Sequence, residues 1–228
     1  MYLIAEVLMI ISVGGLIGAR QAGLVEWEII FKSAASLFFV MEGFLGYLKA
    51  KKNRKVYLYI FLALIFSMGG DVFLALDTNK GIMFISGVAS FAIAHIMFII
   101  AFSKMSKIRK ADFAVAGVII AVLLTIMYVG TFNFKGLLPV IIAYVIIISF
   151  MVSKALSLWR CRKGKECVVG LMMAGGVFFL ISDLILLFVM FGTGVPKIAQ
   201  SANLIVYYLG QLFQARALNI SSESFSQE

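Results

Sequence analysis

The sequence has few charged residues for its length. Asp, Glu, Lys and Arg make up only 14% of the 228 residues, and 63% of the residues are hydrophobic, whereas an ordinary soluble domain carries roughly a quarter charged residues. This composition excludes an ordinary soluble domain and predicts an integral membrane protein. The net charge of +9 must therefore be interpreted from where the basic residues lie relative to the membrane spans.

Histidine and cysteine are also scarce. The chain has one histidine, His95, and two cysteines, Cys161 and Cys167, which are too few for a zinc site built from the usual ligands. No G-x-S-x-G sequence is present, and His95 has no evident nucleophile beside it, so serine or cysteine catalysis is not supported. We therefore expect no metal site.

Proline and low-complexity sequence are nearly absent. The chain has two prolines and no Pro-rich or Ser-rich linker that would separate two domains. We therefore predict a single transmembrane domain, residues 1–219, followed by a short polar tail, residues 220–228.

The sequence does contain eight apolar stretches of the length that crosses a bilayer, about 17 to 25 residues. They predict an all-α, polytopic membrane bundle with about eight transmembrane helices. The predicted spans are 2–19, 29–48, 56–76, 81–102, 112–129, 137–157, 168–191 and 199–219.

The basic residues cluster in three of the connections between these spans. Residues 49–55, 103–111 and 158–166 hold 13 of the 20 Lys and Arg. By the positive-inside rule these loops and both termini lie in the cytoplasm. We therefore predict a multi-pass protein of the bacterial plasma membrane. The expected partner is the lipid bilayer, and the positive charge does not indicate binding to nucleic acid.

Two of the spans carry an aspartate in matching surroundings. Asp71 lies in "FSMGGDVFLAL", and Asp183 lies 112 positions later in "FFLISDLILLF". Each is 15 residues into its predicted span, which places both at about 22 Å in a hydrocarbon core about 30 Å thick. The matching surroundings leave a duplication of four plus four helices open.

Other polar side chains inside the spans are expected to face the bundle interior, because an ionisable group in hydrocarbon costs at least about 2.5 to 3.5 kcal/mol. Depth counting places Lys32 near the level of the two aspartates and puts Glu42 and His95 in a deeper second layer. The alternative for any one of these residues is a simple helix–helix hydrogen bond. In the last span a polar stripe recurs at helical spacing, formed by Asn203, Tyr207, Gln211 and Gln214.

Two carboxyl groups in one membrane cavity favour two kinds of function. One group that holds a proton beside one that is ionised provides a general acid and a general base. A proton-coupled transporter of lipids or small molecules uses the same arrangement. Which aspartate would be the acid cannot be read from the sequence.

Five further segments occur in an order that is typical of one family. They are "GDVFLAL" from Gly70, "SGVASFAIAH" from Ser86, "LPVIIAY" from Leu138, "GGVFFLISDLIL" from Gly175 and "YYLGQLF" from Tyr207. With these segments the chain resembles the YhhN-like family of multi-pass membrane proteins, whose characterised members are lysoplasmalogenases. Two departures from the family pattern are Ser33, where proline often follows the lysine, and Phe98, where an aromatic hydroxyl is common.

The resemblance implies cleavage of the vinyl ether bond of a lysoplasmalogen, which gives a fatty aldehyde and glycerophospho-ethanolamine or glycerophospho-choline. It implies that Asp71 and Asp183 are the catalytic pair and that the partner is a lysophospholipid. It also implies that neither a metal nor an organic cofactor is needed. The residues expected to bind or orient the substrate are Lys32, His95, Asn203, Tyr207 and Gln211.

Three alternatives to this function remain open. A transporter would use the acids as a proton relay. An intramembrane aspartyl protease also needs two acids, but residue 68 is Met where its Gly-x-Gly-Asp signature requires glycine. A purely structural membrane protein is the third.

Overall fold

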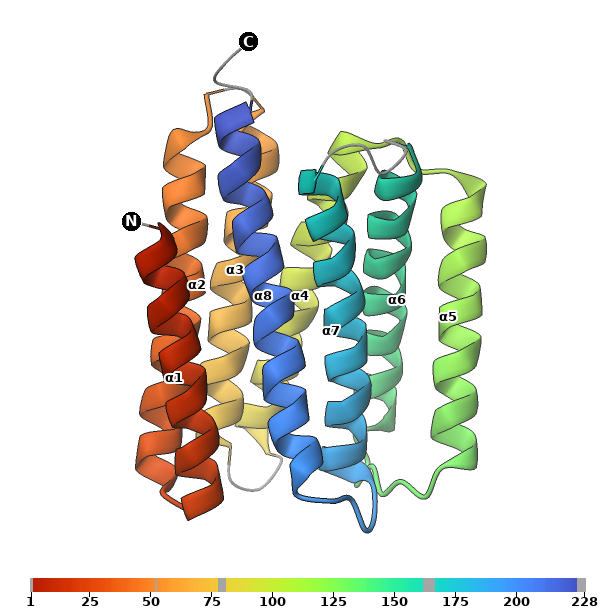
Figure 1. Ribbon diagram of the computed structural model, residues 1–228. Helices are drawn as coiled ribbons and strands as arrows, with labels where there is room; N and C mark the ends of the chain where they lie inside the picture. Colours follow the sequence, from red (N-terminus) through yellow and green to blue (C-terminus); the bar gives the residue numbers. More distant parts are fainter. Residues whose placement is uncertain (1, 52, 78–80, 162–166, 225–228) are drawn as a thin grey trace.

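The part of the chain that the structure describes folds into eight α-helices (Figure 1). The structure, a computed structural model, describes residues 2–51, 53–77, 81–161 and 167–224, with side chains described up to residue 220. The all-helical prediction is confirmed, and the helix boundaries agree with the predicted spans to within a few residues. The helices are α1 (Tyr2–Ala22), α2 (Val25–Lys49), α3 (Arg54–Leu76), α4 (Ile82–Met105), α5 (Lys110–Val129), α6 (Leu138–Cys161), α7 (Cys167–Phe191) and α8 (Ile198–Ser224).

Seven of these helices, α1 to α7, are long and apolar enough to cross a membrane. Helix α8 has the length but is more polar, and it continues to Ser224, five residues beyond the predicted end of its span. Its polar side chains do not face lipid, since Asn203, Gln211 and Gln214 are all buried in the bundle. Residues 225–228 of the predicted tail lie outside the described residues.

Six helices form a closed ring. Around it, α2 packs on α3, α3 on α4, α4 on α6, α6 on α7, α7 on α8, and α8 on α2. Within the described residues α5 packs only on α6, and α1 packs on α2 and α8, so both stand outside the ring. Figure 1 shows α1 and α5 at opposite edges of the bundle.

The packing of the first four helices is repeated by the last four. The pairs α1 with α2, α2 with α3 and α3 with α4 correspond to α5 with α6, α6 with α7 and α7 with α8. The two contacts that close the ring, α2 with α8 and α6 with α4, also correspond. This arrangement supports the duplication that the two aspartate segments left open, as two parallel repeats about an axis along the membrane normal.

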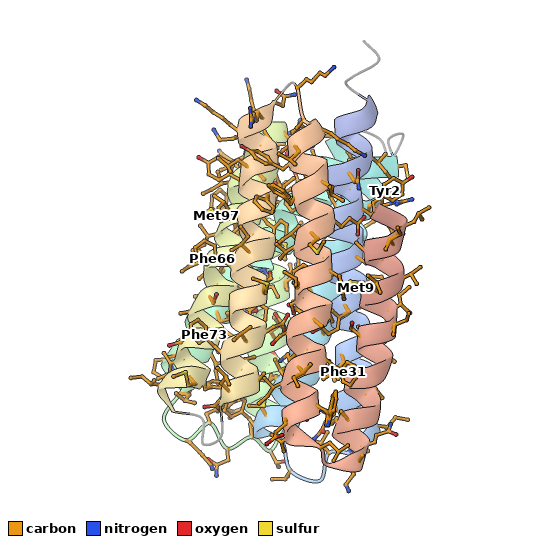
Figure 2. The ribbon with its side chains drawn as sticks, turned by 90° about the vertical axis from the view of Figure 1, so that its left-hand side faces the viewer. Tyr2, Met9, Phe31, Phe66, Phe73 and Met97 are labelled. Atoms are coloured by element: carbon orange, nitrogen blue, oxygen red, sulfur yellow. The ribbon has the colours of Figure 1, made fainter. Side chains whose placement is uncertain are left out.

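The ends of the helices that flank the basic loops all lie at one end of the bundle. α1 also begins and α8 also ends there, at the top of Figure 1. The surface between the two ends carries large apolar side chains such as Phe73, on the outer side of α3 (Figure 2). This distribution fits a bundle that crosses a bilayer with its basic end in the cytoplasm, and below we call the other end the outer end.

Candidate functional site

A cavity of about 410 Å³ lies inside the ring, toward the outer end. α3 and α4 contribute its wall on one side and α7 and α8 its wall on the other, while α1 and α2 contribute residues near its mouth. Its polar lining consists of Arg20, Glu28, Lys32, Asp71, Ser182, Asp183, Gln200, Asn203 and Tyr207.

Both aspartates line this cavity at similar positions in their helices. Asp71 comes 17 residues after the start of α3, and Asp183 comes 16 residues after the start of α7. At 1.5 Å per residue both lie about 25 Å from the basic end. They therefore occupy the outer half of the bundle, where depth counting from the sequence placed them.

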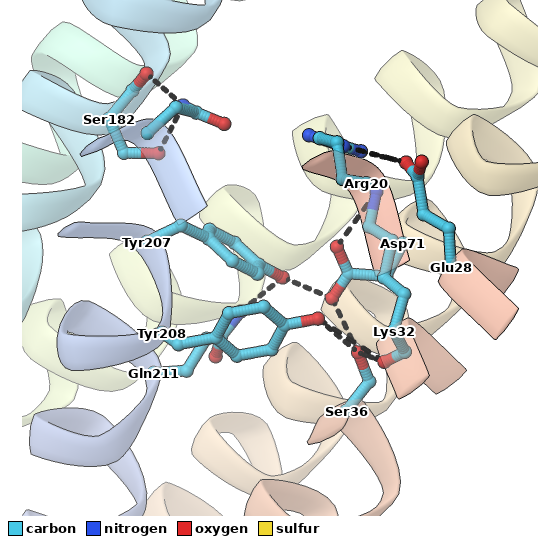
Figure 3. A network of polar contacts seen from close by, with 10 residues as sticks. Arg20, Glu28, Lys32, Ser36, Asp71, Ser182, Tyr207, Tyr208 and Gln211 are labelled. Atoms are coloured by element: carbon cyan, nitrogen blue, oxygen red, sulfur yellow. Dashed lines mark hydrogen bonds and ion pairs between the residues drawn. The ribbon is translucent and has the colours of Figure 1, made fainter. Parts of the chain in front are cut away.

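Asp71 is almost completely buried and is surrounded by hydrogen-bond donors (Figure 3). Its Oδ2 accepts hydrogen bonds from Ser36 Oγ and Tyr207 Oη, each at 2.7 Å. Lys32 Nζ lies 3.6 Å from Oδ1. Because Lys32 and Ser36 are one turn apart on α2, both side chains reach the same carboxyl group.

The second layer around Asp71 fixes the direction of these bonds. Gln211 Nε2 donates to Tyr207 Oη at 2.8 Å, so the hydroxyl hydrogen of Tyr207 is directed at Asp71. Tyr208 Oη donates to the backbone carbonyl of Lys32 at 3.2 Å and so ties α8 to α2. Figure 3 shows these tyrosines reaching from α8 toward α2.

Asp183 has a different set of partners. Tyr144, on α6, donates from Oη to Asp183 Oδ2 at 2.7 Å. His95 Nε2, on α4, lies 2.8 Å from the same Tyr144 Oη and 3.7 Å from Asp183 Oδ2. His95 is fully buried, whereas the Asp183 side chain is 19% exposed and faces the cavity.

Aromatic rings separate the two carboxyl clusters. The ring of Phe179 contacts both His95 and Tyr207, with centroids at 5.5 and 5.8 Å. Phe91 packs edge-on against Tyr207 at 5.8 Å and lines the cavity. The two aspartates thus share the cavity, but each has its own hydrogen-bonded partners.

A smaller pocket adjoins the cavity and is almost entirely apolar. Side chains of α3, α4, α6 and α7 line it, among them Phe84, Ile141 and Leu187. Asp183 and Leu186 line both the pocket and the cavity. The carboxyl group of Asp183 therefore stands where a polar space meets an apolar one.

The prediction of a deeper layer with Glu42 and His95 is wrong for His95, which joins Asp183. Side chains on a helix lean toward its N-terminus, and α4 and α7 run in opposite directions. His95 therefore leans outward and Asp183 leans toward the basic end, so the two meet although their Cα depths differ. Glu42 lies apart from both, near Glu6.

Two members of the polar stripe on α8 hold helices together. Asn203 Nδ2 donates to the backbone carbonyl of Ser182 at 2.6 Å, at the wall of the cavity. Gln214 Nε2 donates to the carbonyl of Met172 at 3.0 Å. Both bonds join α8 to α7, so the stripe has a packing role as well as a place in the site.

Sequence reasoning missed Tyr144 and Ser36, because single tyrosines and serines are ordinary residues in membrane helices. The separation of 112 positions between the two repeats would have identified Tyr144. It relates Asp71 to Asp183, and the same separation relates Lys32 to Tyr144 and His95 to Tyr207. Each aspartate is thus contacted by equivalent positions of the two repeats.

The fold and the site define a polytopic helical membrane protein with an acid-lined cavity between two equivalent halves. The chain belongs to the YhhN family, whose profile matches residues 27–218. This family includes lysoplasmalogenases and is associated with hydrolase activity. Comparisons with curated proteins and with solved structures found no match.

Proposed function

We propose that the protein is a lysoplasmalogenase, which hydrolyses the vinyl ether bond of a lysoplasmalogen inside the membrane. The observation that carries this proposal is the position of Asp183, which lines both the polar cavity and the adjoining apolar pocket. A vinyl ether joins an apolar alkenyl chain to a polar glycerophosphate. A carboxyl group at the same kind of boundary is in the right place to act on that bond.

The chemistry needs one proton donor, one anion and water. Protonation of the alkenyl carbon β to the ether oxygen leaves an oxocarbenium ion, and water adds to that cation. The resulting hemiacetal separates into an aldehyde and an alcohol, so one water is consumed and no redox change occurs. A carboxylate in a dry site stabilises such a cation, as in glycosidases.

The cavity also offers partners for a zwitterionic head group. Lys32 lies beside Asp71, and Arg20 pairs with Glu28 near the mouth. In this proposal the phosphate of the substrate binds the basic side chains Lys32 and Arg20, and the amine of the head group binds Glu28. Four further side chains form hydrogen bonds that orient the lining of the cavity, and these are His95, Tyr207, Gln211 and Asn203.

The proposal is tested with purified protein, lysoplasmenyl-ethanolamine and the corresponding ester-linked lysophospholipid. We expect aldehyde from the first lipid and no fatty acid from the second. Asp71→Asn and Asp183→Asn, each verified to be folded, should lower aldehyde release by about 100-fold or more, the scale of a lost general acid or base. Variants that keep the wild-type rate would exclude the two aspartates from catalysis.

The same assay separates hydrolysis from transport. A transporter would leave both lipids chemically intact, and in proteoliposomes it would move one of them between leaflets in a proton-dependent way. Movement without product would therefore replace the enzyme proposal with the transporter.

A further inference from the structure

The two repeats place chemically different partners around equivalent aspartates. At the position where one repeat has Lys32, the other has Tyr144, and at the position where one has His95, the other has Tyr207. Asp71 consequently has an ammonium group at 3.6 Å. Among the described residues Asp183 instead contacts a phenol and an imidazole.

Asp71 lies beside a group that can only donate. Lys32 Nζ is 3.6 Å from Oδ1, and an ammonium group has donor hydrogens but no acceptor. Tyr207 donates to Oδ2 and accepts from Gln211, while Ser36 Oγ lies 2.7 Å from Oδ2 and 3.0 Å from the Lys32 carbonyl. An ammonium group beside a carboxyl group favours the ionised form of that carboxyl group. Asp71 is therefore the anion of the site, paired with Lys32.

The partners of Asp183 can reverse their bonds. Tyr144 Oη stands between Asp183 Oδ2 at 2.7 Å and His95 Nε2 at 2.8 Å. In one arrangement His95 is an imidazolium that donates from Nε2 to Tyr144, and Tyr144 donates to the Asp183 carboxylate. In the other the carboxyl group holds the proton and donates to Tyr144, which donates to His95. Both arrangements use the same three side chains without moving a heavy atom.

We propose that Asp183, Tyr144 and His95 share one transferable proton, and that Asp183 delivers it to the alkenyl carbon. This assignment rests on the proposed lysoplasmalogenase function. The C–H bond forms as the O–H bond of Asp183 breaks, and the oxocarbenium ion then lies in the cavity that both carboxylates line. The water that adds to the cation loses its proton to Asp183, which returns the shared proton to the three side chains.

The burial of these side chains is consistent with their separate roles. Asp183 faces the cavity, and Tyr144 lines the apolar pocket, but His95 is completely buried behind them. His95 Nδ1 has no hydrogen-bond partner among the described residues, so the bonded series ends there. His95 is thus a positioning residue that acts through Tyr144, while Asp183 is the group that touches the substrate.

The test compares Tyr144→Phe with Tyr207→Phe, which removes the tyrosine hydroxyl that donates to the other aspartate, Asp71. Tyr144→Phe interrupts the sharing of the proton, so we expect a rate about 100-fold lower and a changed pH profile. Tyr207→Phe should lower the rate without altering the shape of that profile. His95→Gln, which keeps a hydrogen bond but cannot hold the proton, should behave like Tyr144→Phe. The other titratable groups that line the cavity with Asp183 are Arg20, Glu28, Lys32, Asp71 and Tyr207. They remain in both Tyr144→Phe and His95→Gln.

An infrared measurement tests the same assignment without turnover. The carbonyl stretch of a protonated carboxyl group should be diminished in Asp183→Asn and retained in Asp71→Asn. The reverse result, or a Tyr144→Phe protein whose pH profile matches the wild type, would overturn the assignment. If the wild type releases no aldehyde but the infrared result holds, the proton sharing stands and only the proposed reaction fails.

Discussion

Asp71 and Lys32 form an ion pair that is largely removed from water, with exposed side-chain fractions of 3% and 10%. Removal of one partner of such a pair leaves a buried charge without its counter-ion, which is strongly destabilising. The Arg20–Glu28 pair lies nearer the outer end, and its side chains are each 24% exposed. Solvent-exposed ion pairs contribute little, so the two pairs are expected to differ in strength.

Lys32→Met should lower the free energy of unfolding by about 3 to 5 kcal/mol, because it strands the Asp71 carboxylate. Adding Asp71→Asn to Lys32→Met should restore part of that loss, since the stranded charge is then absent. Glu28→Gln is the control and should cost about 1 kcal/mol or less. Unfolding in mixed micelles measures the wild type, the single variants Lys32→Met, Asp71→Asn and Glu28→Gln, and the double variant. Strictly additive effects of the Lys32 and Asp71 changes would contradict the pairing.

The ionisable residues of the site could be predicted from the sequence, because Asp71, Asp183 and His95 are costly in an apolar span unless they face an interior. The way in which these three residues group could not be predicted. It depends on how far each side chain leans along its helix and on which helices pack together, and depth counting includes neither. Tyr144 gives no signal of burial cost, so only its equivalence to Lys32 singles it out.

At the scale of helices, α8 positions the site. It carries Tyr207 toward Asp71 and packs on both α2 and α7. The close approach of α8 to α2 depends on Gly46, where an added Cβ would lie 2.9 Å from the backbone nitrogen of Asn219 and 3.0 Å from its Cα. Because those atoms belong to backbone, a side chain at this position has to move a helix.

Gly46→Ala should therefore push α8 away from α2 and destabilise the protein by about 1 to 3 kcal/mol, the usual cost of overpacking. Gly18→Ala is the control, since an added Cβ there meets nothing within 4 Å, and alanine is the better helix former by about 0.5 to 1 kcal/mol. Thermal unfolding and the aldehyde assay measure both effects. We expect Gly46→Ala alone to lose activity, and equal behaviour of the two variants would show that α8 is not held by this contact.

The eight helices were predictable because each apolar stretch has the length that a bilayer requires. Their order around the ring was not, since an apolar surface faces lipid and protein equally well. The outer positions of α1 and α5, for example, are set by packing between helices that are far apart in the sequence. Only the repeated aspartate segments gave a hint of the two equivalent halves.

At the scale of the whole molecule, the site lies near one side of the membrane. Asp71 is five residues from the end of α3 and Asp183 eight residues from the end of α7, which places them about 8 and 12 Å from the outer ends of these helices. The cavity includes Arg20, Glu28 and Gln200, all near that end. The basic loops lie at the other end, so the positive-inside rule predicts that substrate enters from the outer leaflet.

Labelling in oriented vesicles tests this sidedness. Gln200→Cys, in a background with Cys161→Ser and Cys167→Ser, places a thiol at the cavity lining. A charged, membrane-impermeant thiol reagent should stop aldehyde release when it reaches the outer face and leave activity unchanged from the cytoplasmic face. The parent without Gln200→Cys should be insensitive from both sides.

In the wild type, the exposed Cys167 at the basic end should react only from the cytoplasmic face. Inhibition of the Gln200→Cys protein from the cytoplasmic face would reverse the predicted orientation and assign substrate delivery to the inner leaflet.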